Sequence, residues 1–147
     1  MTGRSTMTVY ESNFLIMNSR LVDNTLFYIL LFAGAWNIAL ASSAIFFTEG
    51  FSQAVAISPE IGERFLSKGK WIMVALSGVA FALSGTYRQL RIFILIAVPG
   101  KAIVFLALTN LFLQGQVGVL GLFIGIGDLL FIIPFLLYLR ATVKHEE

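Results

Sequence analysis

The sequence predicts an all-α integral membrane protein, built as a four-transmembrane-helix bundle. Of its 147 residues, 58% are apolar and only 12% are charged, against about 45–50% and about 25% in an average soluble domain. The mean hydropathy is +0.88. So few charges cannot coat a globule of this size, and much of the surface must therefore face lipid.

The first predicted span covers residues 26–47, which contain no charged side chain. At about 1.5 Å per residue, this run is about 33 Å long and matches the hydrocarbon core of a bilayer. Residues 1–25 form an N-terminal arm, expected to be frayed, whose apolar residues 14–17 can lie on the membrane surface. A signal peptide cut after Ala39-Leu40-Ala41 is the alternative, but the long leader and the full-length run favour a retained helix.

Three further apolar runs predict the remaining spans, at residues 71–87, 92–113 and 119–139. The second is short and is bounded by Trp71 and Tyr87, as an interfacial aromatic belt requires. The third is interrupted only by Lys101, and the fourth only by Asp128. Each is close to the length that crosses a bilayer.

The connections between the spans are brief. Residues 114–118 (QGQVG) are so short and rich in glycine that they predict a tight hairpin between antiparallel helices. In the loop of residues 48–70, Ser58-Pro59-Glu60 is a helix-start signal and predicts a short interfacial helix. Residues 141–147 form a C-terminal tail.

The distribution of basic residues predicts the orientation. With four spans, the arm, the loop after the second span and the tail share one side and carry six basic residues, against three in the first loop. The positive-inside rule then places both termini of this multi-pass protein in the cytoplasm. The six are Arg4, Arg20, Arg88, Arg91, Arg140 and Lys144, and the three are Arg64, Lys68 and Lys70.

Small residues recur at helical spacing on three of the spans and predict the faces that pack together. Spacings of three and four place each set on one side of its helix, where backbones can approach closely. Three such stripes favour one compact bundle, although a single GxxxG would equally mark a dimer face. The stripes are Ala33, Asn37, Ala41 and Ala44; Ala75, Gly78, Ala82 and Gly85; and Gly118, Gly121 and Gly125.

Three polar residues are predicted to form a layer near the membrane centre. Asp128, Lys101 and Asn37 each stand close to the middle of a predicted span, and Asp128 continues the glycine stripe into the bundle. An unpaired charge at that depth costs about 2.5–3.5 kcal/mol on insertion scales. We therefore expect an ion pair between Lys101 and Asp128, with Asn37 satisfying the remaining donors or acceptors.

Two prolines interrupt the third and fourth spans. Pro99 frees the carbonyl of Leu95, a second possible partner for Lys101, and Pro134 frees that of Leu130. Broken helices beside a midplane charge recur at transporter binding sites, whereas a kink that merely fits the bundle is the structural alternative. The ion pair has the same two interpretations, a ligand site or a device that fixes helix register.

Several classes of function are excluded by composition. The chain has no cysteine and a single histidine, His145, near its end, which leaves no disulfide, thiolate metal site, iron–sulfur cluster or histidine-ligated haem. The sequence presents no catalytic set, no metal site and no cofactor site. A net charge of +2 is too small to indicate nucleic acid, so the lipid bilayer is the expected partner.

The residues near the midplane resemble those of the DoxX-like family of small four-helix bacterial membrane proteins. The similarity covers about residues 26–140 and is carried by Gly34-Ala35-Trp36-Asn37, Gly85-Thr86-Tyr87, Gly100-Lys101, Gly127-Asp128-Leu129-Leu130 and Pro134. The resemblance implies an inner-membrane bundle whose relatives mostly lack an assigned activity, named after a subunit of a thiosulfate:quinone oxidoreductase. The loop Arg88-Gln89-Leu90-Arg91 departs from the acidic-proline turn of those relatives.

Three functions are compatible with these features. A non-enzymatic or accessory membrane component requires only four spans, small packing stripes and a satisfied core. A quinone-linked redox accessory subunit is the first alternative, because the polar layer could bind a quinone carbonyl while a redox partner supplies electrons. A small proton-coupled exporter ranks last, because the small multidrug resistance proteins carry a glutamate in helix one and this chain has none there.

Overall fold

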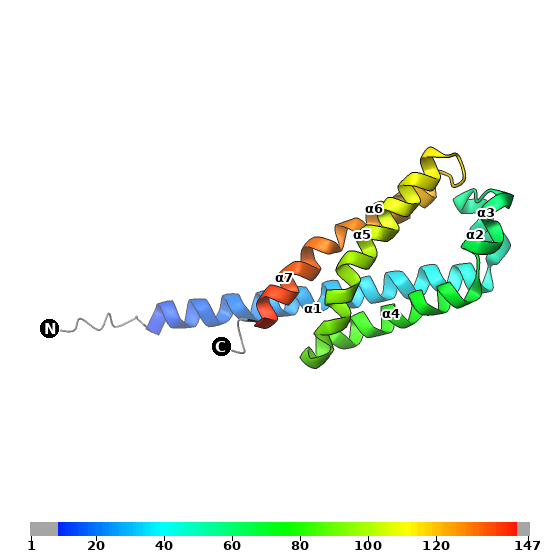
Figure 1. Cartoon of the computed structure of the whole chain (residues 1–147). Coiled ribbons are helices and arrows are strands. Elements are labelled where there is room, and N and C mark those ends of the chain that lie inside the picture. The colour runs from blue at the N-terminus through cyan, green and yellow to red at the C-terminus, as the bar shows by residue number, and fades with distance from the viewer. Residues whose placement is uncertain (1–8, 144–147) are drawn as a thin grey trace.

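The computed structural model describes residues 9–143, and the side chains of residues 24–87 and 89–142. All regular structure in this part of the chain is helical (Figure 1). The elements are α1 (Val9–Phe46), α2 (Thr48–Val55), α3 (Pro59–Phe65), α4 (Lys68–Thr86), the 3₁₀ turn η1 (Arg88–Leu90), α5 (Arg91–Leu113), α6 (Val119–Leu130) and α7 (Ile132–Val143).

Four segments of the described chain are long and apolar enough to cross a membrane. They are Asn24–Phe46, Lys68–Thr86, Arg91–Leu113 and Val119–Thr142. These agree with the four predicted spans in number and order, and their bounds differ by only a few residues. The protein therefore has the helices of a multi-pass membrane protein, judged by their length and composition.

The expected frayed arm is wrong for residues 9–25, because α1 begins at Val9. Its 38 residues correspond to a rod about 57 Å long at about 1.5 Å per residue, well beyond the roughly 30 Å of a bilayer core. The first part of α1 extends beyond the other helices (Figure 1). The apolar residues 14–17 lie outside the described side chains.

The first loop contains two helices where one was expected. The start signal at Ser58-Pro59 is confirmed, with Pro59 at the beginning of α3. The helix α2 was missed, although Phe51 and Val55, four residues apart, bury one face of it. Both helices lie at the same end of the molecule as the α5–α6 turn, and two backbone hydrogen bonds join them to it, from Ser58 to Gln116 (2.9 Å) and from Gly118 to Val55 (2.7 Å).

The fourth span is broken, not continuous as its apolar run predicted. The break falls at Phe131, between α6 and α7. Leu130 is the last residue of α6. Pro134 has no N–H to donate to the Leu130 carbonyl, and this missing hydrogen bond explains the position of the break. Pro99, by contrast, lies inside α5, which continues without interruption.

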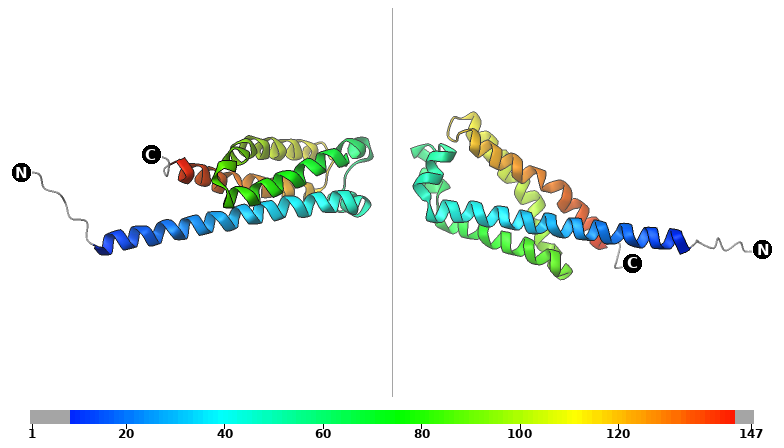
Figure 2. Two further views of the ribbon diagram at one scale, coloured as in Figure 1. Left: turned by 90° about the horizontal axis from the view of Figure 1, so that it is seen from below. Right: turned by 180° about the vertical axis from the view of Figure 1, so that it is seen from behind.

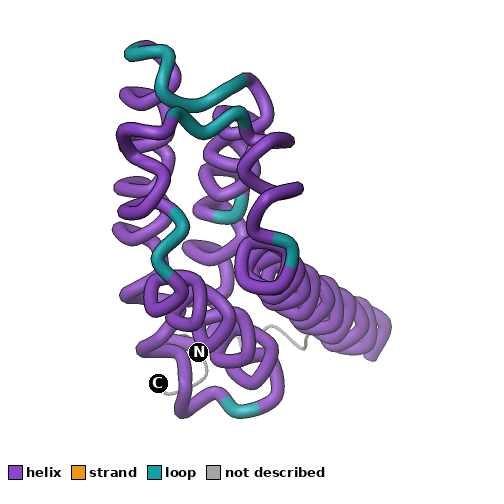
Figure 3. Tube along the Cα trace, turned by 90° about the vertical axis from the view of Figure 1, so that its right-hand side faces the viewer, coloured by secondary structure: helices purple, strands orange, loops and turns teal. Residues whose placement is uncertain are grey.

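The helices form two layers that diverge from one end of the molecule to the other. One layer is α1 packed along α4, and the other is α5 packed along α6 and α7 (Figures 1 and 2). The layers meet near η1 and separate toward α2 and α3, which close the wide end. Seen from that end, short loops join long helices on either side of the molecule (Figure 3).

Two apolar cores hold the layers together, one at each end. At the narrow end, Leu30 of α1, Phe81 of α4, Ile94 of α5 and Phe135 of α7 are buried in a single cluster. At the wide end, a second cluster contains Ala44, Phe51, Val55 and Val117. The middle of the molecule, between these cores, is where the polar residues of the spans are placed.

The small-residue stripes mediate close packing between helices, as predicted, and the structure identifies their partners. Gly78 of α4 faces Gly34 of α1, and Gly125 faces Leu108 of α5. The stripe of Gly118, Gly121 and Gly125 does not pack against α5 alone. Gly118 and Gly121 lie against Val55 at the end of α2, because α2 folds back over the start of α6.

Candidate functional site

A cavity of about 830 Å³ lies between the two layers. This volume is in the range of small-molecule sites, about 300–1,000 Å³. Its walls are almost entirely apolar side chains of α4 and α5, with contributions from α1, α3 and α6. The three residues of the predicted polar layer, Asn37, Lys101 and Asp128, all line this one cavity.

Lys101 and Asp128 form a buried ion pair across the α5–α6 hairpin. The ammonium Nζ of Lys101 donates a hydrogen bond to Oδ1 of Asp128. Lys101 is 5% exposed and Asp128 9% exposed. The structure thus brings together the two charges whose common depth in neighbouring spans suggested an ion pair, and each offsets the cost of burying the other.

Three phenylalanine rings surround the Lys101 ammonium on its other sides. The distances from Nζ to the ring centroids are 5.1 Å for Phe131, 5.6 Å for Phe81 and 6.0 Å for Phe135. All three are close enough for the ring faces to attract the cation. The rings replace part of the hydration that the ammonium loses. Sequence reasoning missed them because they come from α4, from α7 and from the break between α6 and α7.

Asn37 does not complete the ion pair, contrary to expectation. Its amide Nδ2 donates to Oγ of Ser77 on α4 (3.0 Å), and the Ser77 hydroxyl donates in turn to the Val74 carbonyl (2.7 Å). The polar layer is therefore two separate units, an ion pair on α5 and α6 and an amide–hydroxyl pair on α1 and α4. Ser77 was missed, although its place in the middle of the second span is a visible signal.

The Leu95 carbonyl is not the partner of Lys101 in the structure, since the ammonium bonds to Asp128 alone among the described residues. The second partner suggested for Lys101, the carbonyl that Pro99 frees, is therefore not used. Pro134 does act near the site, because the break that it causes at Phe131 follows three residues after Asp128.

The polar residues of the spans lie between the two apolar cores. In every span, the polar residue stands between a side chain of the narrow-end core and one of the wide-end core. In α1, Asn37 lies between Ala33 and Ala44, and in α5, Lys101 lies between Ile94 and Leu111. The polar residues therefore occupy the middle of the bundle, where the cavity is.

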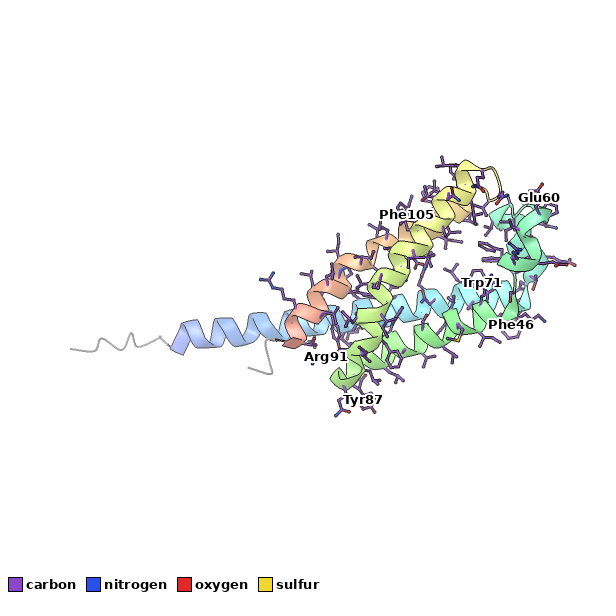
Figure 4. All side chains as sticks on the ribbon, viewed as in Figure 1. Phe46, Glu60, Trp71, Tyr87, Arg91 and Phe105 are labelled. Carbon is purple, nitrogen blue, oxygen red and sulfur yellow. The ribbon has the colours of Figure 1, made fainter. Side chains whose placement is uncertain are left out.

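The wide end of the cavity is built from aromatic residues. Trp71 packs edge-on against Phe51 (5.2 Å between centroids) and Phe65 (5.9 Å), and its Nε1 donates to the Phe65 carbonyl (2.9 Å). Trp71 and Phe65 both line the cavity. Figure 4 shows Trp71 near α2 and α3, at the opposite end of the molecule from Tyr87 and Arg91.

The cavity is open sideways, between α4 and α5. Its lining includes residues that are exposed on the outside of the bundle, among them Met73 and Leu76 of α4 and Ile96 and Val104 of α5. These side chains are apolar, and they lie on helices of membrane-spanning length. Lipid chains would therefore meet the opening in a bilayer.

No group of three or more His, Cys, Asp or Glu side chains that could hold a metal ion occurs among the described residues. The chain matches no protein-family model, no curated protein and no solved structure.

Proposed function

We propose that this chain is a non-enzymatic or accessory component of the bacterial inner membrane, of the DoxX-like type, that holds a lipid-soluble molecule in its interhelical cavity. The observation that carries the proposal is the cavity itself, which is largely apolar, is lined by exposed apolar side chains of α4 and α5, and has a buried ion pair on its wall. Both termini face the cytoplasm in this proposal, on the basis of the distribution of basic residues.

The walls of the cavity favour an apolar ligand. Phe93, Ile96, Val104 and Leu111 line it from α5 alone, and burial of an apolar surface against such side chains supplies the binding energy. A water-soluble substrate would have to leave water and gain few hydrogen bonds in return. A molecule already dissolved in the bilayer meets no such cost.

A quinone-linked redox accessory subunit is the second candidate, and the Lys101 ammonium is the observation that favours it. An ammonium N–H on the cavity wall can donate a hydrogen bond to a quinone carbonyl. In that case a partner subunit with its own cofactor would exchange electrons with the bound quinone.

Tryptophan fluorescence tests whether the cavity takes up a ligand. The chain has two tryptophans, and the Trp36→Phe variant leaves Trp71, which lines the cavity, as the only tryptophan. A fatty alcohol brominated on its chain, added to this variant in nanodiscs at low mole fraction, should quench Trp71 and the quenching should saturate. Quenching that rises in proportion to the probe, without saturation, would contradict a binding site.

A matched pair of substitutions distinguishes the cavity from the outer surface. Ala107 lines the cavity and its neighbour Leu106 does not, while both are exposed on α5. Ala107→Phe should reduce the saturable quenching because the new ring occupies the cavity. Leu106→Phe should leave it unchanged, and equal effects at the two positions would argue against uptake by the cavity.

A further inference from the structure

The ion pair leaves hydrogen-bonding capacity unused on the cavity wall. An ammonium has three N–H groups, and that of Lys101 makes one hydrogen bond within the described part of the chain. The carboxylate of Asp128 accepts through Oδ1, and no described donor reaches Oδ2. Both side chains line the cavity, so a donor and an acceptor are presented side by side to its contents.

Asn37 adds a second acceptor. Because the Ser77 hydroxyl gives its hydrogen to the Val74 carbonyl, it can only accept from Asn37, which fixes Nδ2 of the amide toward Ser77. The amide oxygen Oδ1 then remains without a described donor. Asn37 also lines the cavity, so acceptor oxygens without a described donor stand on the wall beside the unused N–H groups of Lys101.

The charge balance at the ion pair favours an uncharged ligand group there, while the other cation of the lining, Lys70, donates to the Arg64 carbonyl (2.7 Å). Lys101 and Asp128 neutralise each other in apolar surroundings. A charged ligand would pair with one of them and leave the other as an unpaired buried charge, which is costly in a low-dielectric environment. An ionised headgroup would also have to leave the aqueous interface to reach this depth. Neither cost applies to a neutral polar group.

We propose that the cavity selects an uncharged lipid bearing a hydroxyl group, which enters from the membrane between α4 and α5 and binds the ion pair. This inference rests on the proposed function. The hydroxyl oxygen accepts from the Lys101 ammonium, and its hydrogen is donated to Oδ2 of Asp128. A ketone, ester or ether can accept a hydrogen bond but cannot donate one. Bound at the same place, it would leave Oδ2 of Asp128 without a donor.

The apolar part of the ligand follows the cavity toward its opening. Met73, Leu76, Ile96 and Val104 form apolar edges on α4 and α5 that a lipid chain can cross without meeting a charge. The two helices are joined at η1 and diverge from there (Figure 1). A chain can therefore extend into the bilayer while its hydroxyl stays at the ion pair.

The test compares probes that carry a hydroxyl with their methyl ethers, which keep the acceptor oxygen but have a methyl group in place of the hydrogen that the hydroxyl donates. The Trp36→Phe protein in nanodiscs is titrated with a chain-brominated fatty alcohol and with its methyl ether, and a chain-brominated alkylphenol with its own methyl ether forms a second pair. We expect each ether to bind about tenfold more weakly than its parent, or worse, because it leaves the Asp128 oxygen without a donor. The pair with the larger difference shows whether an aliphatic or a phenolic hydroxyl is preferred.

The outcomes separate this inference from the proposed function. Saturable quenching of equal strength by hydroxyl and ether in both pairs would support a binding cavity and overturn the selection of a hydroxyl. Saturable quenching by none of the four probes would overturn the cavity as a binding site. In the double variant Lys101→Leu with Asp128→Leu, the ethers should still bind while the preference for the hydroxyl disappears, and a preference that persists would contradict the assignment to the ion pair.

Discussion

Gly34 of α1 and Gly78 of α4 face each other so closely that neither position has room for a side chain. A Cβ added to Gly78 would lie 2.6 Å from the Gly34 carbonyl oxygen, and one added to Gly34 would lie 2.5 Å from the carbonyl oxygen of Gly78. Both obstacles are backbone atoms, which cannot move without moving a helix. This crossing fixes the layer that carries Asn37 and Ser77.

Gly78→Ala should therefore destabilise the protein. The added methyl forces α1 and α4 apart, and overpacking of this kind costs typically about 1–3 kcal/mol. The measurement is the midpoint of thermal unfolding in detergent. Gly69→Ala is the matched control on the same helix, since a Cβ there meets no atom within 4 Å, and it should leave the midpoint unchanged or slightly raised. Equal losses for both variants would show that the crossing is not a close contact.

Ser77→Ala should lower stability through the amide that it leaves behind. The change removes the acceptor of the Asn37 Nδ2 hydrogen bond, and an unsatisfied buried donor costs about 1–3 kcal/mol. Adding Asn37→Leu to this variant should recover part of the loss in thermal unfolding. Ser43→Ala is the control, because that hydroxyl donates only to the Ala39 carbonyl of its own helix. A loss from Ser43→Ala as large as that from Ser77→Ala would contradict the interhelical role of the bond.

The orientation of the bundle can be tested with a topology reporter. Six of the basic residues outside the midplane are predicted on the side of the termini and three on the other, which indicates cytoplasmic termini. An enzyme active only outside the cytoplasm should give low activity when fused after Glu147 and high activity when inserted after Ile57, between α2 and α3. The opposite pattern would reverse the proposed orientation.

The positions of the spans were predictable because a membrane helix is recognised by length and composition alone. The candidate ion pair was also accessible, since Lys101 and Asp128 are the only charges inside two spans joined by a five-residue turn at residues 114–118. Each needed a partner of opposite charge at similar depth. The break at Phe131 was predicted only in part. Pro134 indicated which carbonyl would lose its hydrogen bond, but not whether the helix would end there.

Other contacts depend on how each helix is rotated, which the sequence does not state. Several polar groups at mid-depth could have accepted the hydrogen bond of Asn37, and only the packing of α1 on α4 selects Ser77. The contact of Gly121 with Val55 was not predicted for a similar reason, since α2 was not expected to fold over α6. The cavity was not predicted at all, because it arises from the divergence of the two layers.

The central claim is that Lys101 and Asp128 are partners on the wall of this cavity, and a double-mutant cycle tests it most directly. Removing one partner of a buried ion pair typically costs about 3–5 kcal/mol, whereas replacing both by apolar residues is often nearly neutral. Unfolding is to be measured in detergent for Lys101→Leu, Asp128→Leu and the double variant. We predict that both single variants are strongly destabilised and that the double variant recovers most of the loss. Losses that simply add in the double variant, with no coupling between the two positions, would contradict the ion pair.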